Sequence, residues 1–125
     1  MGGKVIENPM GMKLGYSEIS LPDSGKQSDL FNGIPDHFIA CESHKDIVAV
    51  VPEGSVMLAE NENSPRAICF DEHIFGLQFH SECSSALMDE LIHYHGKTPV
   101  TLKGQKSSPD LTWCRQVLFN FFNAI

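Results

Sequence analysis

The tripeptide His80-Ser81-Glu82 places an imidazole two residues from a carboxylate, directly after the apolar segment 74–79. That segment is typical of a buried strand, so both groups lie at a strand end. A histidine in such a place acts as a general base when a neighbouring carboxylate fixes its tautomer and ring orientation. For an arbitrary His-x-Glu sequence, a strand-end histidine beside a surface glutamate is the commoner case. His80 is therefore a candidate general base, and Glu82 is its candidate orienting group.

A resemblance favours the catalytic interpretation of this pair. The segment 76–82, Gly-Leu-Gln-Phe-His-Ser-Glu, resembles the Gly-Val-Gln-Phe-His-Pro-Glu block of class I glutamine amidotransferases. The resemblance implies that His80 and Glu82 complete a Cys-His-Glu triad, which hydrolyses glutamine and releases ammonia. Ser81 stands where the family usually has proline, and this difference leaves both functional positions filled.

A second block points to the same family. Cys41-Glu42-Ser43-His44, followed by Val-Pro-Glu-Gly at 51–54, resembles the family's Ser-His block and its Leu-Pro-Glu-Gly turn. The resemblance implies that Ser43 and His44 line the glutamine pocket, largely through backbone groups that hold the substrate's amino-acid end. An ordinary polar pair between a strand and a turn is the alternative. Residues 2–9 and 13–16 resemble the segment after the nucleophile helix, so the chain resembles the second half of a class I domain.

The family's nucleophile has no counterpart in this sequence. In the family it lies within Gly-x-Cys-x-Gly, where glycines allow a sharp strand-to-helix turn. Cys41, Cys69, Cys83 and Cys114 all lack flanking glycines. Cys83 is near His80 in sequence, but a thiol three residues past the base on the same turn is poorly placed to share a substrate carbon with it. We therefore expect the isolated chain to be inactive as a glutaminase.

The elements that must position these residues follow from the apolar periodicity. We expect strands at residues 4–7, 13–21, 37–41, 47–51, 56–59, 67–70 and 74–79. We expect a helical turn at 29–31, a helix capped by Ser84 or Ser85, and a last helix from about residue 108. Strands followed by helices indicate an α/β fold. With the resemblance, we expect the C-terminal portion of a flavodoxin-like, doubly wound fold with mixed strands and two C-terminal helices, as one partial domain over residues 1–125.

Composition excludes several classes of function. The 125 residues carry a formal charge of -7 with nine Lys and Arg, which argues against a nucleic-acid surface. No apolar run approaches the roughly 20 residues that span a bilayer. The four cysteines form no C-x-x-C pair, which suits free thiols in a reducing, cytoplasmic compartment better than disulfides or zinc. We expect no metal and no cofactor.

The leading hypothesis is thus the C-terminal part of a glutamine amidotransferase whose substrate is glutamine. Two alternatives stay open: a non-catalytic remnant serving as an assembly or regulatory module, and a γ-glutamyl hydrolase of the same family. Strands whose neighbours would belong to another segment leave open edges and apolar faces. We therefore expect a homo-oligomer, or association with an N-terminal half or a synthetase partner, through residues 47–51, 74–79 and the Phe119-Phe121-Phe122 helix face.

Overall fold

The computed structural model describes residues 2–61, 64–94 and 109–124. Its strands are β1 (Lys4–Glu7), β2 (Lys13–Ser20), β3 (His37–His44), β4 (Asp46–Val50), β5 (Val56–Asn61), β6 (Ser64–Asp71) and β7 (Ile74–Leu77). Its helices are α1 (Asp23–Lys26), the 3-10 turn η1 (Asp29–Phe31), α2 (Ser85–Tyr94) and α3 (Thr112–Ala124). The predicted α/β class with two C-terminal helices is confirmed.

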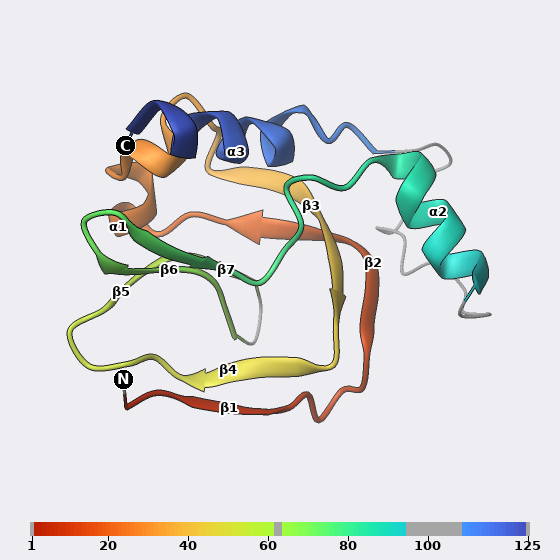
Figure 1. Cartoon of the computed structure of the whole chain (residues 1–125), viewed down its shortest axis with the longest axis horizontal. Coiled ribbons are helices and arrows are strands. Elements are labelled where there is room, and N and C mark those ends of the chain that lie inside the picture. The colour runs from red at the N-terminus through yellow and green to blue at the C-terminus, as the bar shows by residue number, and fades with distance from the viewer. Residues whose placement is uncertain (1, 62–63, 95–108, 125) are drawn as a thin grey trace.

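The strands form two sheets. β1 and β4 make a two-stranded sheet at one edge of the molecule, and the other five strands follow the order β3-β2-β5-β6-β7 (Figure 1). Every pairing between the described strands is antiparallel. The large sheet curls, because an isolated bridge pairs Cys41 on β3 with His80, which follows β7 at the other end of the strand order. This curl brings the two predicted site segments together.

The core lies between the curled sheet and helix α3. Aromatic rings from three segments contact one another in series: the ring centroid of Phe31 lies 6.1 Å from that of Phe38 in a tilted pair, and that of Phe38 lies 5.8 Å from that of Phe79 in an edge-to-face pair. The buried Asn120 side chain fastens α3 by donating to the carbonyls of Leu30 and Asn32 at 3.0 and 2.9 Å. These contacts fix the strand that leads into His80, because Phe79 immediately precedes it.

Helix α2 begins as the sequence predicts. The Ser84 hydroxyl accepts a hydrogen bond from the Leu87 backbone N–H at 3.2 Å, which is a helix N-cap. The helix buries Met88 and Ile92, and the Tyr16 hydroxyl on β2 donates to the Ser85 carbonyl at 3.3 Å. In Figure 1, α2 projects from the side of the sheet, away from α3. It therefore continues directly from the turn that holds Glu82.

The structure adds detail to the expected elements. Asp23–Lys26, where no element was expected, form α1, whose Gly25 packs so tightly that a Cβ would lie 1.8 Å from the Leu58 carbonyl oxygen. The strand expected at 67–70 starts earlier, because Ser64 and Pro65 begin β6. On α3, Phe119 and Phe122 are exposed by 63% and 62%, as expected for an open apolar helix face, and Trp113 is exposed by 39%. The periodicity locates an apolar helix face and says nothing about whether another surface covers it.

Candidate active site

The candidate site is centred on His80, which lies just beyond β7. Its backbone N–H donates to the Cys41 carbonyl at 2.9 Å, so the residue is fixed against β3. Its ring Nδ1 lies 2.7 Å from Oε1 of Glu82. Both side chains are open to solvent, with 44% of His80 and 65% of Glu82 exposed. The sequence-predicted pair is therefore in contact and accessible.

The contact with Glu82 sets the tautomer of His80. An ionised carboxylate only accepts hydrogen bonds, so Nδ1 must donate. In the neutral ring this leaves Nε2 with a free lone pair, and no described residue hydrogen-bonds to it. Partial burial opposes ionisation of Glu82, but hydrogen bonds from its own backbone N–H and from His80 outweigh it and lower the pKa of this carboxyl. The pair has the geometry of a general base with an orienting carboxylate.

Between the two lies Ser81, at the position where the resembling family has proline. The residue is 4% exposed, and its hydroxyl has no hydrogen-bond partner among the described residues. A proline would leave no such group. The hydroxyl points inward, away from the solvent that His80 and Glu82 face, so it is not a candidate nucleophile.

The backbone groups of Ser43, near the end of β3, face the same strand edge to which His80 is hydrogen-bonded. Backbone N–H and C=O groups of successive strand residues point to alternate edges. The Cys41 carbonyl points away from β2 to bind His80, so the backbone groups of Ser43, two residues further on, point the same way. The structure thus brings the backbone of Ser43 to the edge that carries His80.

The His44 side chain turns inward. It is 7% exposed, its Nδ1 lies 2.9 Å from the Asp46 carbonyl oxygen, and its Nε2 lies 3.4 Å from Oε1 of Glu42. Both ring nitrogens are therefore engaged by the protein. The backbone groups of His44 point to the opposite edge from those of Ser43, because His44 pairs with Lys13 on β2.

The sequence reasoning missed Glu42, which is fully buried. Its carboxylate accepts hydrogen bonds from the Arg66 guanidinium and from the Ser17 hydroxyl, and Lys13 lies 4.0 Å away. Burial opposes its ionisation, but the bonds from His44 and Ser17 and the Arg66 charge outweigh it and lower the pKa of Glu42. A glutamate inside the apolar strand 37–44 was the signal in the sequence, because an unpaired buried carboxylate is rare.

The thiols near His80 are poor nucleophiles. Burial raises the pKa of Cys41 and Cys83 and raises the pKa of Cys114 to about 11. Because the thiolate is the reactive form, these three groups are inert at neutral pH. Cys83 also directs its Sγ to the Ser84 carbonyl, at 3.3 Å. None of these three thiols has the lowered pKa and exposure that are typical of a reactive cysteine.

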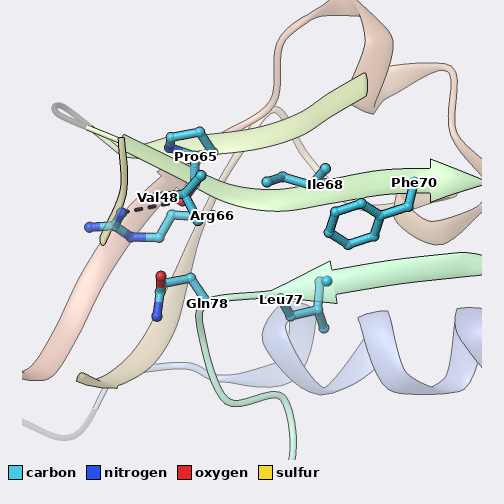
Figure 2. A pocket seen from close by; sticks show the side chains of 8 residues that line it. Val48, Pro65, Arg66, Ile68, Phe70, Leu77 and Gln78 are labelled. Carbon is cyan, nitrogen blue, oxygen red and sulfur yellow. Dashed lines mark hydrogen bonds between the residues drawn. The ribbon is translucent and has the colours of Figure 1, made fainter. Parts of the chain in front are cut away.

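Other features of the described residues lie apart from this pair. A pocket of about 130 Å³ is formed by side chains from β4, β6 and β7 with Gln78, and it contains none of Ser43, His44, His80 or Glu82 (Figure 2). Within the described ranges, no group of three or more His, Cys, Asp or Glu side chains is arranged to hold a metal ion. No helix there is both long and apolar enough to cross a membrane.

Comparisons with known proteins agree on one family. The family model for glutamine amidotransferase class-I matches residues 1–96. A glutamine-hydrolyzing GMP synthase from Latilactobacillus sakei is 42% identical over 82 residues, which are 64% of this chain and 16% of that protein. Another, from Thermosipho africanus, is 35% identical over 82 residues, or 64% of this chain and 15% of that protein.

Solved structures with a similar fold include other glutamine amidotransferases. The crystal structure of a glutamine amidotransferase from Methylobacillus flagellatus superposes with a TM-score of 0.70 at 16% identity, covering 99% of this chain and 57% of that one. A glutamine amidotransferase from Thermotoga maritima gives a TM-score of 0.69 at 18% identity, with 98% and 54% covered. The chain thus spans about a sixth of the length of the curated relatives and just over half of these two structures.

Proposed function

This chain belongs to the class I glutamine amidotransferase family, and we propose that it contributes the general base and a substrate-binding edge to a site that hydrolyses glutamine. The observation that carries the proposal is the 2.7 Å contact between Nδ1 of His80 and Glu82, which leaves Nε2 free on an exposed ring. The nucleophile would be a cysteine on polypeptide outside this sequence.

In the proposed mechanism, His80 moves a proton in both directions. Nε2 takes the proton of the attacking thiol while sulfur bonds to the amide carbon of glutamine. As the C–N bond breaks, the imidazolium returns the proton to the departing ammonia, leaving a γ-glutamyl thioester. Water then attacks the thioester, again with His80 as base, and releases glutamate. Glu82 stabilises the imidazolium and keeps Nε2 directed at the reacting atoms.

The backbone of Ser43 would hold the amino-acid end of glutamine beside this base. Its N–H and C=O share the edge on which Cys41 binds His80. An N–H donor suits the α-carboxylate of glutamine, and a carbonyl acceptor suits its α-ammonium group. The His44 N–H belongs to the peptide that also carries the Ser43 carbonyl, so His44 would act by fixing that peptide, and no cofactor or metal takes part in the steps.

We further propose that the released ammonia passes to a synthetase partner in the cytoplasm. The support is that the similar curated proteins are GMP synthases, of which this chain matches only a part. Association would cover the exposed apolar side chains of β4, β7 and α3, which include Val50, Ile74, Leu77, Phe119 and Phe122. Oligomerisation through the same faces is the alternative, and light scattering after size-exclusion chromatography at micromolar concentration separates the two. A stable monomer of the chain alone would contradict self-association.

A chimeric enzyme tests the function. Residues 1–96 would replace the matching segment in the Latilactobacillus sakei GMP synthase, to which this chain is 42% identical over 82 residues. We expect the chimera to release ammonia from glutamine, and the isolated chain to release none, since a triad without its nucleophile retains little catalysis. A folded chimera with no glutamine hydrolysis would overturn the proposal.

One observation favours the non-catalytic alternative. The thiols of Cys41, Cys83 and Cys114 are buried with raised pKa values, which does not suit a nucleophile beside His80. An assembly module needs the fold but not His80. Unchanged partner binding together with unchanged hydrolysis in a His80→Ala chimera would support that alternative.

A further inference from the structure

A buried charge network lies directly behind the proposed substrate-binding edge. Glu42 on β3 accepts hydrogen bonds from Arg66 on β6 and from Ser17 on β2, and Arg66 also binds Ser64. Glu42 and Arg66 are 0% and 4% exposed. The network thus ties three strands together at the end of β3.

The residues immediately before and after Ser43 in the sequence both belong to the network. Glu42 precedes Ser43 and binds the β2 and β6 side chains, while His44 follows it and is held by Glu42 and by the Asp46 carbonyl. Side chains of residues 42 and 44 share one face of the strand, and Ser43 points to the other. Fixing the two neighbours fixes both peptide planes of Ser43, and these carry the groups proposed to bind glutamine.

The position of His44 between two acceptors adds a second feature. Both ring nitrogens lie near these groups, with the Asp46 carbonyl oxygen at 2.9 Å and the Glu42 carboxylate at 3.4 Å. Glutamine in place of Glu42 would remove the carboxylate charge from this contact.

We propose that Glu42 is a positioning residue for glutamine binding: through His44 and Arg66 it holds the Ser43 backbone in the orientation that the substrate requires. The inference rests on the proposed function and assigns a role to a residue that touches neither substrate nor His80. Burying a carboxylate is costly even when it is paired, so a purely structural role would be served as well by apolar side chains.

The test compares binding with stability in the whole 125-residue chain. L-Glutamine would be titrated into ¹⁵N-labelled protein while the Ser43 amide and the His44 ring nitrogens are followed by NMR. We expect Glu42→Gln to weaken glutamine binding about tenfold, the size typical of losing a group that orients a binding residue. Glu60→Gln, at an exposed position on β5, is the matched control and should bind as the wild type does.

A double variant separates positioning from stability. Glu42→Leu with Arg66→Met replaces the ion pair by apolar side chains of similar size, and such replacements are often neutral or stabilising. We expect its unfolding midpoint in urea to match the wild type or exceed it, while glutamine binding stays weak. Recovery of wild-type affinity in this variant would overturn the positioning role.

The remaining outcomes are also decisive. Wild-type affinity in Glu42→Gln overturns the role of Glu42 but leaves the proposed function in place. If no protein binds glutamine, the substrate-binding role of Ser43 fails. In that case, a Ser43 amide signal that broadens in Glu42→Gln keeps Glu42 as the residue that orders this edge, and an unchanged signal overturns it.

Discussion

The molecule contains two histidine–glutamate pairs with the same sequence spacing, one buried and one exposed. Glu42 and His44 flank Ser43, while His80 and Glu82 flank Ser81. Side-chain exposure is 0% and 7% in the first pair and 65% and 44%, for the glutamate and the histidine, in the second. The same two residue types, two positions apart, thus form a buried contact at one site and, at the other, an accessible contact that we propose transfers protons.

A histidine beside a glutamate is a candidate general base only if one of its ring nitrogens is free, so the pair alone is not a sufficient criterion. In the buried pair, His44 has both nitrogens occupied. In the exposed pair, only Nδ1 of His80 is bound, and by one carboxylate. A general base needs an unoccupied nitrogen directed at the substrate. Of the two histidines, His80 alone has a ring nitrogen that no described residue occupies.

The largest expected effect comes from His80→Ala in the chimeric enzyme. Glutamine hydrolysis should fall by about a thousandfold or more, because the base that activates the thiol and protonates ammonia is lost. His44→Ala in the same chimera should raise KM more than it lowers kcat, because its ring takes no part in proton transfer. Steady-state ammonia release measures both. Equal losses of kcat in the two variants would erase the distinction between the pairs.

The buried pair should contribute more to the unfolding free energy than the exposed pair does. Arg66→Met leaves the Glu42 carboxylate buried without its strongest partner, and removing one member of a buried ion pair costs about 3–5 kcal/mol. Glu82→Gln changes an exposed contact and should leave the unfolding free energy near the wild-type value. Urea unfolding of the isolated chain provides the comparison. A comparable loss in both variants would show that the exposed pair is also structural.

Glu82→Gln should have an intermediate effect on activity. The backbone N–H of His80 keeps its hydrogen bond to the Cys41 carbonyl, so the residue stays in place and glutamine hydrolysis should fall by about tenfold to a hundredfold, less than in His80→Ala. The kcat of the chimera is the measurement, with Glu60→Gln as the control. A loss as large as that of His80→Ala would make Glu82 indispensable rather than orienting.

The smallest expected effect is on the pH dependence of stability. The pKa of Glu42 is lowered in the folded chain from its ordinary value of 4.5. A lowered folded pKa means that the stabilisation is complete above the ordinary value and is lost as the pH falls through the folded value. Glu42→Gln should therefore show a shallower loss of stability below about pH 4.5 than the wild type does. Urea titrations at several acidic pH values test the slope, and identical slopes would contradict the assignment.

The sequence by itself determined the family, the candidate base and most of the elements. The Gln-Phe-His-Ser-Glu block, the alternating apolar residues of β2 to β7 and the Ser84 cap are local patterns, and local patterns survive folding. The missing Gly-x-Cys-x-Gly turn was also visible, since a nucleophile elbow is defined by adjacent residues. Such features need no knowledge of what lies across the sheet.

Only the tertiary structure decided what each polar side chain does. Glu42 lies 24 positions from Arg66 and 25 from Ser17 in sequence, and the curled sheet alone brings their side chains together. The same curl joins His80 to Cys41 and turns the Ser43 backbone to that edge. Burial, not residue type, separates His44 from His80, because desolvation and occupied hydrogen-bonding groups arise only when distant strands meet.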